Sequence, residues 1–224
     1  MKTVLITGAS RGLGLEFSRQ YGAAGWRVIA TCRDPDKAVA LREISGVEVH
    51  RLDVDDLASA GALRRVLKGT PIDVLINNAG IFANLGPDGG VDYDLWLRLY
   101  NTNALGALRV VQAFLPSLLA GDDKKLVFIT SSVASITNAS SSNHGYRMSK
   151  VALNMLAKCL SLDLVGRGVT TLLFCPGHVQ TDMGGPRATV APQESVSGMI
   201  RRIDASTIAD TGRFQDYQGE DRPW

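Results

Sequence analysis

The sequence predicts an α/β protein with one doubly wound parallel sheet of about seven strands and helices on both faces. Short apolar, β-branched runs alternate with longer segments of helical periodicity along the chain. The runs are apolar almost throughout, as expected for strands that are buried on both faces. Right-handed crossovers between such strands place helices on both sides of the sheet.

The expected elements follow in a regular order. Strands are expected at residues 4–7, 27–31, 47–52, 72–76, 125–130 and 169–175, and helices at about 12–24, 35–44, 57–68, 93–119, 146–166 and 193–202. Leu13, Phe17 and Tyr21 have the spacing of one helix face. The tail, residues 212–224, carries Phe214 and Trp224, so it is expected to pack against the body. No linker or repeat divides the chain, so residues 1–224 are expected to form a single domain.

Composition excludes several classes of protein. Lys and Arg number 24 against 22 Asp and Glu, a balance that argues against nucleic-acid binding. No apolar run approaches the roughly 18–20 residues of a membrane span, and residues 4–6 are too short a run for a secretory signal. Cys32, Cys159 and Cys175 are odd in number and include no Cys-x-x-Cys pair. This pattern favours a reducing cytoplasm and no metal site.

A glycine-rich turn follows the first expected strand. Gly8, Gly12 and Gly14 lie between that strand and the first expected helix. Glycines allow a tight turn and close backbone approach, and a helix N-terminus offers free N–H groups to a phosphate. In this position the turn predicts a dinucleotide site.

The motif spacing resembles the short-chain dehydrogenase/reductase family over nearly the whole chain. Four motifs carry the resemblance in order: Thr7-Gly-x-x-x-Gly-x-Gly14, Asn77-Asn78-Ala79-Gly80, Tyr146-x-x-x-Lys150 and Pro176-Gly177. Residues 146–155, 179–186 and the ending are similar to C-factor and sniffer-type carbonyl reductases within this family. The resemblance implies a Rossmann fold and an NAD(P)-dependent oxidoreductase.

The resemblance also implies a set of cofactor-binding residues. These are Gly8, Ser10, Arg11, Gly12, Leu13, Gly14, Arg33, Asp53, Val54, Asn77, Ala79, Gly80, Tyr146, Lys150, Pro176, Gly177, Val179 and Thr181. An NAD enzyme needs a carboxylate at the end of the second strand for the ribose 2′-hydroxyl. Arg33 occupies that region instead, and a guanidinium suits a 2′-phosphate. NADPH is therefore expected, with NADH as the alternative should Asp34 take that position.

Tyr146 and Lys150 are expected to form the catalytic pair. They are four residues apart on an expected helix and share one face. A neighbouring ammonium should lower the pKa of the phenol toward the working range. In the family the lysine also holds the nicotinamide ribose.

The family also implies a serine and an asparagine at the site. The strand ending Ile129-Thr130-Ser131-Ser132 resembles a family pattern whose second serine is catalytic, which selects Ser132. Ser131 and Ser135 remain alternatives. Asn103 resembles the family asparagine whose side chain holds a water linked to the lysine. His144 and His178 are interpreted as loop residues rather than catalysts.

The expected function is NADPH-dependent reduction of an aldehyde, ketone or quinone, with the tyrosine as proton donor. Three alternatives remain: a C-factor-like signalling protein, an NAD-linked alcohol dehydrogenase and an NADPH-sensing regulator without turnover. The expected partners are a small carbonyl substrate and a second copy of the chain, as a homodimer or homotetramer, because the expected helices at 95–119 and 146–166 carry excess apolar surface. Neither nucleic acid nor a membrane is expected as a partner.

Overall fold

The computed structural model describes residues 1–83 and 91–224 of the 224-residue chain. Strands and helices alternate along it, as the sequence predicts. The strands are β1 (Thr3–Ile6), β2 (Arg27–Cys32), β3 (Val47–Arg51), β4 (Val74–Asn77), β5 (Lys125–Ile129), β6 (Thr170–Cys175) and β7 (Arg213–Asp216). The helices are α1 (Gly12–Ala23), α2 (Val39–Arg42), α3 (Leu57–Val66), α4 (Tyr93–Tyr100), α5 (Gly106–Leu119), α6 (His144–Leu164) and α7 (Pro192–Ala205).

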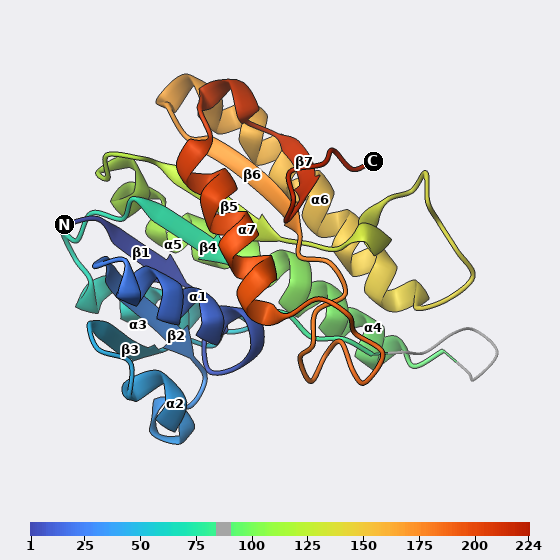
Figure 1. Cartoon of the computed structure of the whole chain (residues 1–224), viewed down its shortest axis with the longest axis horizontal. Coiled ribbons are helices and arrows are strands. Elements are labelled where there is room, and N and C mark those ends of the chain that lie inside the picture. The colour runs from blue at the N-terminus through green and yellow to red at the C-terminus, as the bar shows by residue number, and fades with distance from the viewer. Residues whose placement is uncertain (84–90) are drawn as a thin grey trace.

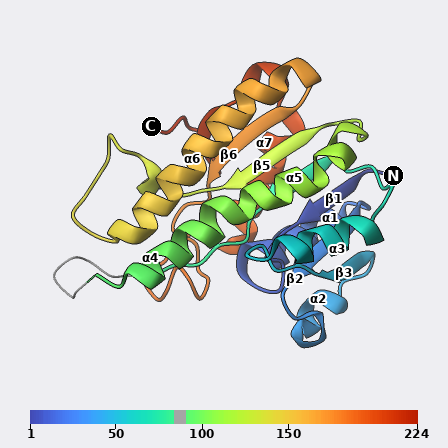
Figure 2. The same ribbon diagram turned by 180° about the vertical axis from the view of Figure 1, so that it is seen from behind.

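The seven strands form one parallel sheet in the order β3-β2-β1-β4-β5-β6-β7. The chain runs outward from β1 to β3, returns to the centre at β4 and then runs outward to β7. Helices α1 and α7 cover the face that Figure 1 shows, and α3, α5 and α6 cover the opposite face in Figure 2. The doubly wound Rossmann-like fold is confirmed. Its switch point lies between β1 and β4, where such sheets bind their ligands.

Alternate residues of the strands build two separate cores. Val4 and Ile6 of β1 belong to one core with Phe17 of α1 and Met199 of α7. Leu5 belongs to the opposite core, which α3, α5 and α6 complete. All of these side chains are fully buried, and each stabilises the fold by about 1.5–3 kcal/mol relative to an exposed position. Burial on both faces explains why the strand sequences are apolar throughout.

The expected helix over residues 93–119 is helical throughout but not uniform. A single π-helical stretch, Asn101–Leu105, joins α4 to α5. Such stretches often occur at functional sites, and this one contains Asn103, which is buried. None of the helices in residues 1–83 and 91–224 is both long enough and apolar enough to span a membrane.

The tail packs against the body and adds the edge strand β7 beside β6. Beyond β7, the ring of Trp224 lies 5.7 Å from the ring of Phe214. The carbonyl oxygen of Trp224 accepts hydrogen bonds from the backbone N–H of Thr137 at 2.9 Å and from its hydroxyl at 2.7 Å. Thr137 belongs to the β5–α6 loop (residues 130–143), so the tail fastens that loop to the sheet.

Candidate active site

The glycine loop, residues 7–14, joins β1 to α1 at the carboxyl edge of the sheet. Gly8 has a φ of +66°, and a Cβ at this position would lie 2.8 Å from Cα of Ala79. Any side chain at Gly14 would collide with the carbonyl oxygen of Gly8. Both positions therefore require glycine. The first N–H groups of α1 have no side-chain cap, so they are available to an anion.

Asn78 fixes the shape of this loop. Its side-chain amide donates hydrogen bonds to the carbonyl oxygens of Thr7 at 2.9 Å and of Gly8 at 3.1 Å. In return, the hydroxyl of Thr7 accepts hydrogen bonds from the backbone N–H groups of Asn78 and Ala79, each at 3.0 Å. Sequence reasoning selected Asn77 instead, but its side chain is buried at the end of β4 with no hydrogen-bond partner among the described residues.

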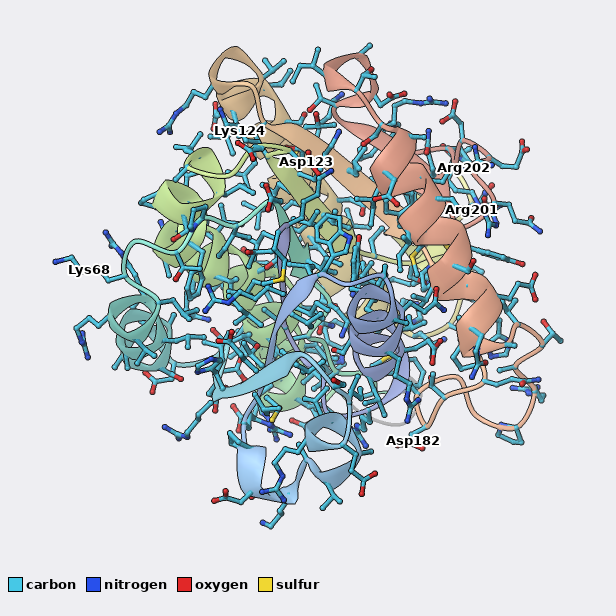
Figure 3. The ribbon with its side chains drawn as sticks, turned by 60° about the vertical axis from the view of Figure 1, so that its left-hand side comes forward. Lys68, Asp123, Lys124, Asp182, Arg201 and Arg202 are labelled. Atoms are coloured by element: carbon cyan, nitrogen blue, oxygen red, sulfur yellow. The ribbon has the colours of Figure 1, made fainter. Side chains whose placement is uncertain are left out.

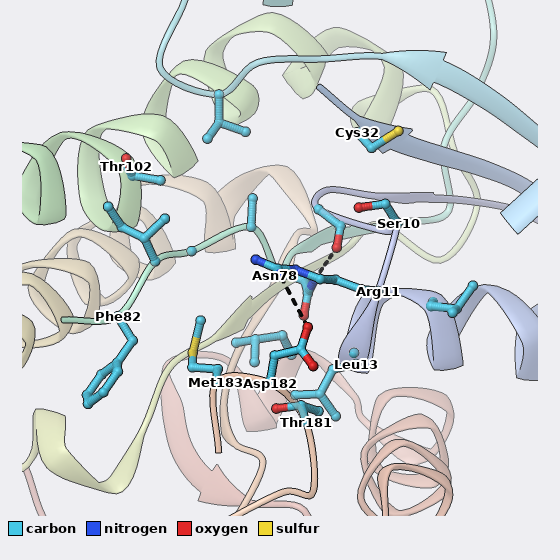
Figure 4. A pocket seen from close by; sticks show the side chains of 18 of the residues that line it. Ser10, Arg11, Leu13, Cys32, Asn78, Phe82, Thr102, Thr181, Asp182 and Met183 are labelled. Carbon is cyan, nitrogen blue, oxygen red and sulfur yellow. Dashed lines mark hydrogen bonds and ion pairs between the residues drawn. The ribbon is translucent and has the colours of Figure 1, made fainter. Parts of the chain in front are cut away.

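A cavity of about 770 Å³ runs along the carboxyl ends of the strands (Figure 4). Most of the expected cofactor residues line it: Gly8, Ser10, Arg11, Gly12, Leu13, Arg33, Asp53, Val54, Ala79, Gly80, Tyr146, Lys150 and Thr181. A second cavity of about 580 Å³ shares Tyr146 and Thr181 with the first, and Gly177 and Val179 line it. Gly14, Asn77 and Pro176 line neither of these two cavities.

The lining of the first cavity fits a dinucleotide. The glycine loop and the uncapped start of α1 offer backbone N–H groups to a pyrophosphate. Arg33 lines the cavity just beyond β2. Asp34, the carboxylate that would favour NADH there, does not line it and pairs with Lys37 at 2.9 Å. Arg33, and not Asp34, therefore lines this part of the cavity.

Tyr146 and Lys150 lie on consecutive turns of α6. Both line the first cavity, and Tyr146 also lines the second. Both side chains are buried. The Lys150 ammonium donates a hydrogen bond to the carbonyl oxygen of Ile129 at 3.0 Å and lies 5.8 Å from the centre of the Tyr146 ring. Phe82 packs edge-to-face on the same ring at 5.0 Å. The Tyr146 ring thus has the Lys150 ammonium and the Phe82 ring as neighbours.

Burial sets the ionisation of this pair in a direction that the sequence did not predict. It raises the pKa of Tyr146 above its ordinary value, with a smaller contribution from Cys175, and a hydrogen bond with Ser131 partly opposes the rise. Burial also lowers the pKa of Lys150 from 10.5 to about 8. Burial of the phenol therefore opposes the lowering of its pKa that was expected from the neighbouring ammonium.

The serine beside Tyr146 is Ser131. It lines the second cavity together with Tyr146. Its hydroxyl also accepts a hydrogen bond from the N–H of Val133 at 3.3 Å, which begins the 3-10 turn Ser132–Ala134. Ser132 is exposed and lines neither cavity, and Ser135 is buried against the tail and bonded to the Trp224 oxygen. The structure therefore selects the first serine of the pair, in place of Ser132.

Asn103 is buried beside the pair and holds the chain that follows β4. Its side-chain oxygen accepts a hydrogen bond from the N–H of Ile81 at 2.8 Å, and its amide donates to the Ile81 carbonyl oxygen at 2.9 Å. The same amide donates to the hydroxyl of Ser149 at 2.9 Å. Both amide hydrogens are thus used, and the side chain acts by positioning Ile81 and α6. Sequence reasoning missed Ser149, which lies directly before Lys150 in the motif.

The loop between β6 and α7 (residues 176–191, the β6–α7 loop) closes the site from the other side. The ring of His178 hydrogen-bonds with the carbonyl oxygen of Gly184 at 2.8 Å, which places this histidine in a bracing role. Asp182 forms an ion pair with Arg11 of the glycine loop at 3.1 Å (Figure 4). The pair connects the β6–α7 loop to the loop that begins α1.

Comparison with known proteins agrees with this geometry. The sequence profile described as "short chain dehydrogenase" matches residues 2–190. The chain belongs to this family. As a short-chain dehydrogenase it is an oxidoreductase, and its four motifs lie within the matched region.

Its relatives are of the C-factor and sniffer type, as the sequence predicts. The C-signal protein of Myxococcus xanthus is 47% identical over 155 residues, covering 69% of this short-chain dehydrogenase and 93% of the relative. The NADPH-bound carbonyl reductase from chicken fatty liver superimposes with a TM-score of 0.92 at 33% identity, over 100% of this chain and 99% of that one. The carbonyl reductase Sniffer of D. melanogaster superimposes with a TM-score of 0.91 at 26% identity, over 100% of both chains.

Proposed function

We propose that this short-chain dehydrogenase reduces the carbonyl group of a small aldehyde, ketone or quinone with NADPH. The observation that carries the proposal is the position of the Tyr146 phenol. It lines both cavities and lies beside Lys150 in the first and Ser131 in the second. A proton donor thus stands where a dinucleotide and a small molecule would meet, and the whole chain, residues 1–224, acts as one domain around it.

The choice of NADPH rests on the adenosine end of the first cavity. Arg33 lines that end, and Asp34 is engaged with Lys37. Arg11 lines the same cavity from the glycine loop. Guanidinium groups match phosphate geometry and carry a permanent charge. The NADPH in the chicken carbonyl reductase structure supports the same choice.

The residues of the site then divide the chemistry among them. When bound, NADPH supplies a hydride to the carbonyl carbon, and the carbon–oxygen π bond breaks. Ser131 donates a hydrogen bond to the oxygen as it gains charge, and Tyr146 donates the proton that turns the alkoxide into an alcohol. Lys150 holds the nicotinamide ribose hydroxyls and attracts the resulting phenolate. Asn103 fixes the position of Ile81 relative to α6. This holds Tyr146 and Lys150 of α6 in place beside the substrate oxygen.

The ionisation of Tyr146 suits its role as a proton donor. Burial raises the pKa of the phenol, and a protonated phenol is the form that donates to an alkoxide.

The protein is proposed to act as a homodimer or homotetramer in the cytoplasm. Helices α4 and α6 pack on each other and lie on the side of the sheet that Figure 2 shows. Both helices carry large apolar side chains that are exposed to solvent. These are Tyr93, Leu97, Tyr100, Met148, Met155 and Leu162. A second copy of the chain would cover them. All three cysteines are free, which suits a reducing compartment.

The test follows NADPH absorbance with a panel of aldehydes, ketones and quinones, beside NADH and the Tyr146→Phe variant. We expect turnover with NADPH that disappears in the variant, because phenylalanine keeps the packing and removes the proton donor. Turnover with NADH alone would contradict the role of Arg33, and equal turnover in the variant would contradict the role of Tyr146.

The similarity to C-signal supports a second candidate, a signalling role in which the nucleotide site matters more than turnover. The Tyr146→Phe variant separates the two candidates. If the variant binds NADPH as tightly as the parent and keeps the biological effect, signalling is independent of reduction. A third candidate is an NADPH sensor without chemistry. Such a protein would bind NADPH, and none of the carbonyl compounds in the panel would cause its oxidation.

A further inference from the structure

The second cavity has an apolar body larger than a small aldehyde needs. Its volume is about 580 Å³, within the range of sites that hold drug-sized ligands, roughly 300–1,000 Å³. Apolar side chains line much of it: Phe82, Val133, Val179, Met183 and Pro186. Phe82 and Met183 are partly exposed, at 41% and 47%. The cavity therefore presents an apolar surface beside the Tyr146 phenol.

The charges around this cavity do not balance. Its single lining carboxylate among the described residues, Asp182, is paired with Arg11. Arg187 also lines the cavity, and no described residue forms a hydrogen bond or an ion pair with its guanidinium. An arginine at the wall of a cavity, with no carboxylate to neutralise it, attracts anions.

A second guanidinium adds to this positive charge from behind the wall. Arg147 donates hydrogen bonds to the carbonyl oxygens of Ser142 at 2.8 Å and Val133 at 3.3 Å, and to the hydroxyl of Ser140 at 2.5 Å. All three acceptors are neutral, so the charge of Arg147 is not compensated within this set. Val133 belongs to the cavity wall, and the field of Arg147 reaches the same space.

We infer that the substrate is a carbonyl compound with an apolar or aromatic body and a carboxylate, and that Arg187 binds this carboxylate. The carbonyl lies at Tyr146 and Ser131, the apolar body lies against Phe82 and Met183, and the anionic group lies at Arg187. This inference rests on the proposed function, because it uses the same cavity. It makes Arg187 a specificity-determining residue and excludes cationic carbonyl compounds as good substrates.

The test compares 4-carboxybenzaldehyde with 4-nitrobenzaldehyde, which has nearly the same shape and no net charge. The variants are Arg187→Gln, Arg187→Lys and the control Arg201→Gln. Arg201 lies on α7, away from Asp182 and the β6–α7 loop (Figure 3). In Arg187→Gln, we expect the ratio of kcat/KM for the carboxylate to that for the nitro compound to fall roughly tenfold through KM, the loss of one charge-assisted hydrogen bond. Arg187→Lys should restore part of the ratio, and Arg201→Gln should leave it unchanged.

One result would overturn the inference while the enzyme still reduces 4-nitrobenzaldehyde: an unchanged ratio in Arg187→Gln. The ratio is unchanged if both compounds keep their kcat/KM, and also if both lose it equally, which would indicate a structural role. If the parent protein turns over neither compound, the proposed function fails for them, and the inference is tested by binding alone. A ligand-observed NMR titration in the presence of the oxidised cofactor then measures the affinity of 4-carboxybenzaldehyde for the parent and for Arg187→Gln. The inference requires that this compound bind more tightly to the parent.

Discussion

The two neighbouring serines at the end of β5 give a sharp test of the active site. Ser131 lines the second cavity together with Tyr146, whereas Ser132 is exposed and lines neither cavity. The substitutions Ser131→Ala and Ser132→Ala remove the same hydroxyl from adjacent positions. We expect only the first to impair reduction, because only Ser131 reaches the reacting oxygen.

The expected losses of kcat and of unfolding free energy follow from two interactions of Ser131. One is with the reacting substrate oxygen, and the other is with the backbone N–H of Val133. Removal of one preorganised donor to a developing oxyanion lowers kcat by roughly 10²–10³-fold, and we expect a loss of this order in Ser131→Ala. The variant also loses the bond from the Val133 N–H, at 3.3 Å, that caps the following turn. By analogy with helix caps, this loss costs about 1 kcal/mol of unfolding free energy. Ser132→Ala should change the unfolding free energy by less than about 0.5 kcal/mol and leave kcat nearly unchanged.

The assay is steady-state NADPH oxidation with one carbonyl substrate, beside urea unfolding of both variants. Unfolding identifies any part of the kinetic loss that comes from instability. A large fall of kcat in Ser132→Ala with normal activity in Ser131→Ala would refute the assignment. A similar fall in both variants would show that the turn after β5, and not one hydroxyl, supports catalysis.

Three further predictions concern the cofactor end, the buried lysine and the buried asparagine. Arg33→Asp should lower kcat/KM for NADPH by roughly 10²-fold and raise it for NADH, since it removes a charged hydrogen-bond donor from a phosphate; no change in the ratio of the two would contradict the role of Arg33. Lys150→Met should abolish reduction yet raise the unfolding free energy at pH 7, because folding lowers the pKa of Lys150 from 10.5 to about 8, a penalty of about 3 kcal/mol that methionine removes, and loss of the hydrogen bond to the Ile129 carbonyl oxygen offsets only about 1–2 kcal/mol of it. Between these two pH values the unfolded chain binds more protons, so the stability of the parent rises with pH, and the advantage of Lys150→Met in urea unfolding should shrink over this range. Asn103→Ala leaves the backbone of Ile81 without its two partners, and should lower the unfolding free energy by about 2–3 kcal/mol and kcat at least tenfold; a stable variant with normal kcat would exclude its positioning role.

Much of the fold was predictable because strands that are buried on both faces have sequences that are apolar throughout. Apolar runs at β1, β4 and β6 are long enough to be seen, and the glycines that follow β1 mark the switch point. β7 was harder to predict as a strand, since Arg213 and Asp216 flank Phe214 and the segment has four residues. An edge strand of this kind is defined by its neighbour β6 rather than by its own pattern.

The site was predictable as a set of motifs and less so atom by atom. Motif spacing located Tyr146 and Lys150, but the length of the β5–α6 loop is not encoded in any motif, and so the choice between Ser131 and Ser132 needed the structure. The direction of the Tyr146 pKa shift depends on how much water reaches the phenol. The sequence shows that a lysine lies near the phenol, but it does not show how deeply the phenol is buried.

The hydrogen bonds between Thr137 and Trp224 affect when the β5–α6 loop can be anchored during synthesis of the chain. The two residues are 87 positions apart, and synthesis delivers the N-terminal part of a chain first. The glycine loop and the strands around it are complete while β7 and Trp224 have not yet been synthesised. The loop that carries Ser131 gains this anchor only when the last strand pairs with β6. The nucleotide-binding part of the nascent chain can therefore form before the anchor at Trp224 holds the loop that carries Ser131.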